Sequence, residues 1–501
     1  MISRQAKFLL IIFVGIGSIV ILTKSSTRIN NFIFSKVLEV YKIKYPATPI
    51  RDTQETNSWH DPRNLFPIIA YNFPQKTNDL VASLQILEKG GINIVINTTM
   101  GYMPEPFEVQ KAISKLKNSN LQLIVILENE CKDEYVFKNS NNTTNVDIKK
   151  YLERFNDEYI YGWYIWDEPG ENRKNCGFLD FVPNDDNEDV NILSSQILKD
   201  TTFSRKLAFV NLFPTYWEGT PNLYDYEKYL ELFIASQKYK PRLLCFDHYP
   251  FRKEEFGGFR SDYFANLEII SKKAKTRNIP FWTIILSSGH GEYKNPTFEE
   301  IRFQVFSALA YGAKGIGYYL YSRALEEYGY TSWILEKNVD NIYTADTSYG
   351  RNYLPVKKLN EQVQTLGKIL NNLESEKVIH TSLYPSNQIG ISKSILNNLP
   401  ENAPIKSIIK NNDLDSDPKI LIGVFYEKQS PPNDKKYLMV VNKDVRNQSS
   451  ITIKFDRQYS VYEFDKNAGG KILKAQNHLI KILMLPGEGV LLSLENYLSL
   501  K

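Results

Sequence analysis

Cysteine and histidine are scarce in this chain of 501 residues. Three cysteines and five histidines are present, and their spacing resembles neither a zinc site nor a disulfide framework. We therefore expect no metal and no cofactor. Cys131 and Cys176 follow neighbouring predicted strands and could pair in an oxidising compartment, whereas Cys245 lies in an apolar run and is expected in the core.

A strong excess of charge is also missing. The 61 basic and 57 acidic residues leave a net charge of +4, and the basic residues are scattered. This distribution argues against a nucleic-acid partner. A Gly-rich phosphate turn is absent too, because the first predicted strand runs into Tyr71-Asn-Phe-Pro. That absence disfavours a doubly wound nucleotide-binding sheet, which is the runner-up fold.

The amino terminus carries a long apolar run, Phe8 to Leu22, preceded by Arg4 and Lys7 and followed by Lys24. We interpret residues 1–25 as an uncleaved signal anchor, with its positive end in the cytoplasm. The chain would then contact the membrane through this helix, with its body in the periplasm, outside the cell or in a lumen. A cleaved signal peptide and a secreted protein are the alternative. Residues 26–62 are expected to form a stalk.

Residues 63–375 alternate short β-branched or aromatic runs with amphipathic helical stretches, which is typical of βα units around a parallel sheet. The expected strands are 66–71, 92–97, 121–127, 161–166, 206–212, 242–249, 280–286 and 314–321. The expected helices are 79–89, 107–117, 146–155, a stretch ending near 200, 226–237, 261–275, 297–311 and 356–373. Eight such units predict an α/β fold, a (β/α)8 TIM barrel.

The pattern changes in residues 376–501. Strand-like runs at 420–426, 437–442, 450–455 and 490–494 follow one another without helices and are separated by Gly-containing turns. This stretch predicts a small antiparallel β-sandwich.

The stretch Tyr161 to Trp166 is the most informative strand, because it runs straight into Asp167 and Glu168 before Pro169 stops it. Adjacent carboxylates are costly to bury unless they are paired or functional. In a (β/α)8 barrel they would lie at the carboxyl end of a strand, where active sites are built.

Other polar and aromatic residues are expected at the same end of the barrel. Asp247 and Glu292 are further catalytic candidates. The expected substrate-binding residues are Asn72, Asn97, Glu128, Asn211, Trp217, His248, Tyr249, His290, Tyr319, Tyr321 and Trp333. Tyr319 and Tyr321 alternate along the eighth strand, so both rings are expected on one side of it. Carboxylates, amides and aromatic rings together suit a saccharide or glycoconjugate substrate.

The run Trp163-Tyr-Ile-Trp-Asp-Glu-Pro169 resembles the strand-four motif of the clan of retaining glycoside hydrolases with (β/α)8 barrels, which includes the family 42 β-galactosidases. The stretch 302–316 is similar to the seventh helix and eighth strand of family 42-like proteins. The resemblance implies a glycoside hydrolase with Glu168 as general acid/base. It places Asp167 where the clan usually has an asparagine that holds the sugar 2-substituent.

The clan's nucleophile is a glutamate that ends strand seven, and this chain reads Trp282-Thr-Ile-Ile-Leu-Ser-Ser-Gly-His290 there. An Asp-Glu pair without that glutamate is similar to substrate-assisted enzymes such as the family 123 N-acetylgalactosaminidases, in which the 2-acetamido oxygen attacks. In a conventional alternative, Asp247 or Glu292 is the nucleophile. A rival from another class is a non-catalytic carbohydrate-binding barrel that has lost its nucleophile.

Overall fold

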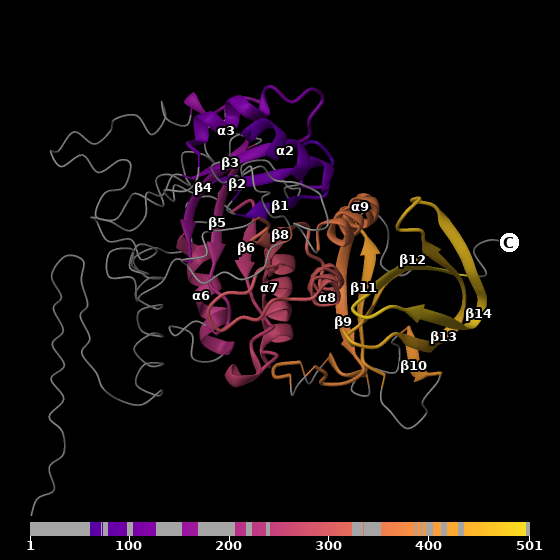
Figure 1. The fold of residues 1–501 in the computed structure, drawn as a ribbon. Helices are drawn as coiled ribbons and strands as arrows, with labels where there is room; N and C mark the ends of the chain where they lie inside the picture. The colour runs from indigo at the N-terminus through magenta and orange to yellow at the C-terminus, as the bar shows by residue number, and fades with distance from the viewer. Residues whose placement is uncertain are drawn as a thin grey trace, which may run out of the picture.

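The computed structural model describes residues 61–71, 73, 79–97, 104–126, 153–168, 206–216, 223–236, 241–322, 334, 352–385, 388–391, 394–396, 404–411, 418–428 and 435–496. Eight parallel strands form a closed barrel in sequence order, and β8 pairs with β1 (Figure 1). They are β1 (Ile68–Tyr71), β2 (Ile94–Asn97), β3 (Gln122–Ile126), β4 (Ile160–Asp167), β5 (Leu207–Leu212), β6 (Leu244–Asp247), β7 (Phe281–Leu286) and β8 (Ile316–Tyr319). The predicted (β/α)8 barrel is confirmed.

Helices follow six of these strands within the described residues. They are α2 (Leu80–Lys89), α3 (Pro106–Ile113), α6 (Leu223–Ser236), α7 (Tyr263–Arg277), α8 (Phe298–Ala310) and α9 (Tyr353–Leu370). Two of these helices begin or end at residues that are typical helix caps. Thr297 and Glu300 form a capping box at the start of α8, and Asn278 ends α7 in the left-handed conformation. Most of the helix predicted at 146–155 and all of the one ending near 200 lie outside the described residues.

The inside of the barrel is filled by side chains that alternate along the strands with those facing the helices. One apolar cluster inside it contains Ile69, Ile124, Phe209, Cys245 and Trp282 among others. The prediction that Cys245 is a core residue is therefore confirmed.

The segment that leads into β1 packs against the amino end of the barrel. The Tyr161 hydroxyl donates to an Asp61 carboxylate oxygen at 3.0 Å, and Arg63 pairs with the same carboxylate at 2.6 Å. The Arg63 guanidinium also lies 4.9 Å from the centre of the Tyr161 ring. These contacts fix the segment before β1 against the amino end of the barrel.

The carboxy-terminal strands form one sheet, not the two sheets of the predicted sandwich. The strands are β9 (Leu373–His380), β10 (Ile405–Lys410), β11 (Ile420–Glu427), β12 (Lys435–Asn442), β13 (Ser449–Phe464), β14 (Lys471–Met484) and β15 (Gly489–Asn496). Their order is β10-β13-β15-β12-β11-β9, with β14 on the other side of β13.

The long strand β13 explains the difference. Residues 451–455 pair with β10, and residues 459–463 pair with β15. The register shifts between these halves, and such an irregularity bends a strand. The sheet therefore curls over and encloses its own core, which includes Ile422, Val440, Ile453 and Ile482.

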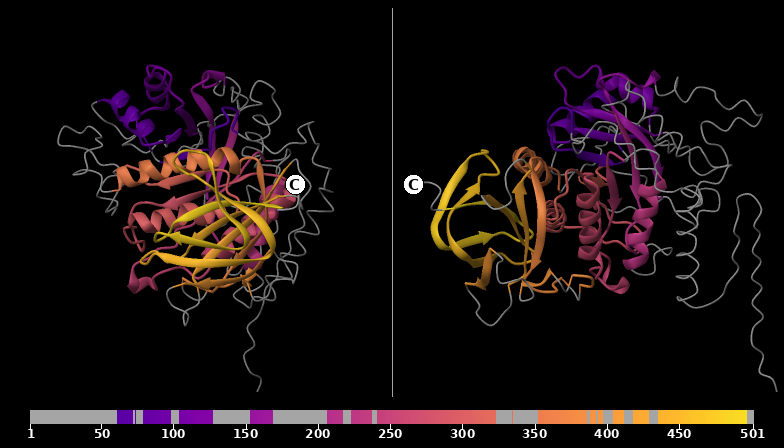
Figure 2. Two further views of the ribbon diagram at one scale, coloured as in Figure 1. Left: turned by 90° about the vertical axis from the view of Figure 1, so that its right-hand side faces the viewer. Right: turned by 180° about the vertical axis from the view of Figure 1, so that it is seen from behind.

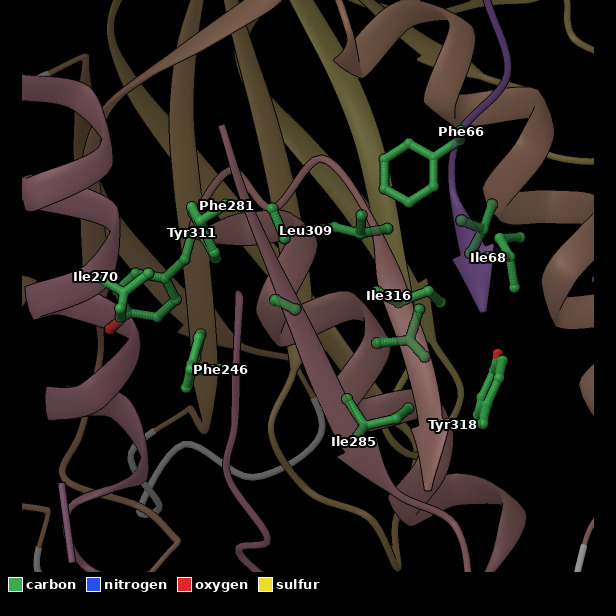
Figure 3. Close-up of a cluster of buried hydrophobic side chains, with 14 of the residues drawn as sticks. Phe66, Ile68, Phe246, Ile270, Phe281, Ile285, Leu309, Tyr311, Ile316 and Tyr318 are labelled. Carbon is green, nitrogen blue, oxygen red and sulfur yellow. The ribbon is translucent and has the colours of Figure 1, made fainter. Parts of the chain in front are cut away.

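Helix α8 lies between the barrel and this sheet (Figures 1 and 2). It is buried on nearly all sides, as expected for a helix covered by two layers. Gly423 on β11 permits the close approach, since a Cβ there would lie 2.0 Å from the Ala310 carbonyl oxygen. Figure 3 shows part of the apolar layer around the barrel, with Phe281, Ile285 and Ile316 on the strands and Ile270 and Leu309 on the helices.

Among the described residues, no helix combines the length and apolarity that crossing a bilayer requires. The apolar run at residues 8–22 lies outside them.

Candidate functional site

Two carboxylates and one amide share the floor of the barrel mouth. Nδ2 of Asn211 donates to Oδ1 of Asp167 at 3.1 Å and to Oδ1 of Asp247 at 3.2 Å. Asn211 and Asp247 are buried, whereas Asp167 is half-buried. Asp167 and Asp247 are the last residues of β4 and β6, and Asn211 is the last but one of β5.

A bulge in β4 places Asp167 beside Asn211. Tyr164 pairs with Phe209, and Asp167 pairs with Asn211. Between these two pairs β4 is three residues long and β5 only two, so β4 carries one extra residue. In a regular strand, residues three positions apart point to opposite faces. The bulge instead lets Asp167 lie on the same inner side as Tyr164, a device often found next to active sites.

Asp247 is the most perturbed acid on this floor. Burial raises the pKa of Asp247, and the neighbouring charge of Asp167 raises it further, to about 7. Hydrogen bonds from Asn211 and Tyr249 oppose the shift without cancelling it. Near neutral pH the protonated and ionised forms of Asp247 are therefore both populated, which suits a group used in acid–base chemistry.

Glu168 stands beside this floor at a turn of the backbone. Its φ is 46°, in the left-handed region that residues other than glycine rarely adopt, and its N–H donates to the Asn211 carbonyl at 2.8 Å. The turn takes the half-buried Glu168 out of the line of the strand. Such backbone outliers concentrate at functional sites.

Aromatic rings surround the mouth above Asp247. Tyr249 stacks on Tyr319 with ring centres 5.6 Å apart, and the edges of Tyr71 and His290 meet Tyr319 at 5.4 and 5.5 Å. The Tyr71 hydroxyl bonds to that of Tyr164 and donates to Asp167 at 3.3 Å. Rings from five segments of the barrel thus lie around the two carboxylates.

His248 is directed away from this group. It follows Asp247 directly, so its ring points toward the helices, where Nε2 lies 3.5 Å from Oδ1 of Asp262. Burial lowers the pKa of His248, although Asp262 opposes the change. The ring also meets the edge of Tyr216. In this position His248 supports the wall of the mouth from behind.

Glu292, on the loop after β7, is held by two arginines of the loop after β6. It is paired with Arg260, and one of its oxygens lies 4.0 Å from Arg252. Arg260 in turn lies 3.6 Å from the centre of the Tyr216 ring. None of the contacts described for Glu292 joins it to the carboxylates on the floor.

Tyr321 and Tyr319 lie on different sides, contrary to the sequence expectation. Strand β8 ends at Tyr319, so the alternation stops there. Tyr319 faces the mouth, whereas Tyr321 is fully buried next to Tyr318, and its hydroxyl lies against Gly90 in the helical layer.

The remaining predicted residues are partly described. Asn97 ends β2, is buried and donates from Nδ2 to the Pro104 carbonyl at 2.8 Å. Asn72, Glu128, Trp217, Trp333, Cys131 and Cys176 lie outside the described residues.

Sequence reasoning missed four tyrosines of this site, Tyr71, Tyr164, Tyr216 and Tyr293. Tyr71 is the last residue of β1, two positions after the inward Ile69, so strand alternation could have identified it. Tyr216 and Tyr293 lie in loops and meet through their hydroxyls at 3.2 Å, which no sequence pattern indicated. Within the described residues, no group of three potential metal ligands occurs.

No family model and no curated protein sequence matches this chain. Solved structures align with it at low identity. A family 51 α-L-arabinofuranosidase from Bifidobacterium longum has 9% identity and a TM-score of 0.44, covering 87% of this chain and 97% of its own. A family 39 glycoside hydrolase from Bacteroides cellulosilyticus has 9% identity and a TM-score of 0.41, covering 86% and 81%. A GH30 endoxylanase from Clostridium papyrosolvens has 9% identity and a TM-score of 0.38, covering 86% and 96%.

These three neighbours are glycoside hydrolases.

Proposed function

We propose that this protein is a glycoside hydrolase that acts at the carboxyl end of its barrel, with Glu168 as the proton donor. The observation that carries the proposal is the pair of carboxylates, Asp167 and Asp247, joined by Asn211 beside Glu168 and beneath tyrosine rings. Glycoside cleavage needs an acid to protonate the leaving oxygen and a second group to stabilise positive charge on the sugar ring.

Each group has a role in this proposal. Glu168 protonates the glycosidic oxygen as the bond to the anomeric carbon breaks. The charge shared by Asp167 and Asp247 lies under the sugar and stabilises the cationic transition state. The tyrosine rings hold the apolar face of the sugar and exclude water.

Two routes, both retaining, fit this arrangement. In the substrate-assisted route, Asp167 accepts a hydrogen bond from a 2-acetamido N–H, and the acetamido oxygen attacks the anomeric carbon. In the conventional route, the Asp247 carboxylate attacks instead, which requires it to be ionised. Glu292 is a further catalytic candidate, and the variant Glu292→Gln tests it.

A carbohydrate-binding barrel without catalysis is the second candidate. It is favoured by the end of β7, where Ser287 and Ser288 stand in place of an acid and the Ser287 hydroxyl donates to the Leu320 carbonyl at 3.0 Å. Such a protein would bind sugars with the same tyrosine rings.

Chromogenic glycosides with and without a 2-acetamido group separate these possibilities. The full chain is assayed beside Glu168→Gln, Glu292→Gln and, as a matched control, Glu254→Gln at an exposed glutamate of the 3-10 helix η3 (Glu254–Phe256). Loss of the proton donor should lower kcat by about 10²–10⁴-fold for poor leaving groups and much less for activated ones. Equal activity of Glu168→Gln and Glu254→Gln would overturn the assignment.

Two further results decide the mechanism. Inhibition by a thiazoline mimic of the acetamido intermediate selects the substrate-assisted route. Sugar binding without turnover of any glycoside tested supports the non-catalytic barrel.

A further inference from the structure

The outer side of the curled sheet carries aliphatic side chains and lysines. Half of the exposed large hydrophobic residues, six of twelve in the described parts of the chain, lie on β10, on β14 or directly after β14. The aliphatic-lysine face is defined here by Ile409, Lys454, Leu479, Lys481, Leu483 and Leu485.

Strand pairing brings these residues together. Thr452 of β13 lies between Ile409 of β10 and Lys481 of β14, and Lys454 pairs with Leu479. On β14, Ile480, Ile482 and Met484 point into the sheet's core, so the residues between them point outward. Leu483 is 62% exposed and Leu485 48%.

The charged side chains of this face are all basic. Ser407, Asn411, Ser450 and Thr452 fill its remaining outward positions, and no Asp or Glu occupies an outward position of the paired stretches 450–454 and 479–483. It also lacks aromatic rings at these positions, so it does not resemble a sugar-stacking platform. Aliphatic side chains interleaved with lysines fit a surface with a hydrocarbon interior and negative headgroups.

A tether to a membrane is independently indicated by the amino-terminal sequence, with its apolar run from Phe8 to Leu22 between basic residues. The 39 positions from Leu22 to Asp61 could reach on the order of 130 Å if extended. A tether of that reach does not orient the body. It does keep the body at a high effective concentration near the bilayer, so a weakly binding face is sufficient to orient it.

We propose that the aliphatic-lysine face docks the tethered protein on an anionic lipid surface. The leucines enter the headgroup region, and Lys454 and Lys481 lie against the lipid phosphates. Strands β13 and β14 lie on the side of the sheet away from the barrel (Figures 1 and 2). Docking through this face therefore places the sheet between the bilayer and the barrel.

The test uses the full chain reconstituted in vesicles of phosphatidylcholine with phosphatidylglycerol, and in vesicles of phosphatidylcholine alone. A tryptophan placed by Leu483→Trp reports contact with the bilayer through quenching by lipids with brominated acyl chains, measured against the unsubstituted chain. The matched control is Leu354→Trp, at a leucine of α9 that is 48% exposed.

We expect added quenching for Leu483→Trp in the anionic vesicles and none for Leu354→Trp. Lys454→Gln and Lys481→Gln should each weaken docking by about fivefold, since a lysine at an anionic surface contributes on the order of that factor. Quenching of Leu483→Trp that does not exceed the control, or that is unchanged in neutral vesicles, overturns the proposal. A detergent-solubilised dimer that Leu483→Ser dissociates would also overturn it, by assigning the face to a second copy of the chain.

Discussion

Asp167 and Asp247 accept hydrogen bonds from one and the same atom, Nδ2 of Asn211, at 3.1 and 3.2 Å. The amide holds the two carboxyl groups close together, and burial together with the charge of Asp167 raises the pKa of Asp247. Asn211 is therefore the residue that joins the two carboxyl groups at the barrel mouth.

Replacing Asp247 by Asn should stabilise the protein at alkaline pH. The folded-state pKa of Asp247 is raised to about 7 by burial and by Asp167. The folded protein therefore binds the Asp247 proton more tightly than the unfolded chain does. The stability that comes from this proton is fully present below the unfolded-state pKa and is lost as the pH rises through 7. Relative to Asp247→Asn, the unsubstituted protein should lose about 2–3 kcal/mol between pH 5 and pH 8. Urea unfolding at the two pH values measures this difference, with Glu254→Gln as the control. An Asp247→Asn protein whose stability falls in parallel with the parent would contradict it.

Removing the shared amide should raise the pKa of Asp247 further. The Asn211 hydrogen bond lowers that pKa, so Asn211→Ala should move the limb of the kcat/KM pH profile that belongs to Asp247 toward higher pH. A loss of activity from misfolding alone would lower the whole profile without moving the limb. The pH dependence of kcat/KM on a chromogenic substrate distinguishes the two results.

Tyr319 should contribute mainly to substrate binding. Its ring stacks on Tyr249 and meets Tyr71 and His290, and loss of such a ring removes about 0.5–1.5 kcal/mol beyond simple burial. Tyr319→Ala should raise KM by roughly tenfold or less, with a smaller change in kcat. Tyr224→Ala, at a tyrosine of α6 that is 62% exposed, is the control. Unchanged KM and sugar binding in Tyr319→Ala would exclude the ring from the site.

The contact between barrel and sheet should not tolerate a methyl group at Gly423. A Cβ there would lie 2.0 Å from the Ala310 carbonyl oxygen, whereas nothing lies within 4 Å of a Cβ at Gly470. Gly423→Ala should lower the free energy of unfolding by about 1–3 kcal/mol through overpacking, and Gly470→Ala should have little effect. Thermal unfolding of the two variants compares them directly. Equal Tm values would show that the interface accommodates the methyl group without a loss of stability.

The sequence by itself determined the barrel, because strand and helix periods, capping residues and turns are local properties of the chain. The ends of α8 and α7 follow from Thr297, Glu300 and Asn278, which act within a few residues of themselves. The same reasoning identified Asp167, Asn211 and Asp247 as residues at the ends of successive strands.

Only the tertiary structure decided how these residues meet. The bulge in β4 turns Asp167 inward, the end of β8 separates Tyr319 from Tyr321, and the bend in β13 makes one curled sheet of the expected two. Each depends on register between strands that are distant in sequence, and the packing of both faces selects that register. A pattern of alternating residues records which positions are apolar, but a shift of one residue reverses the direction in which every later side chain points.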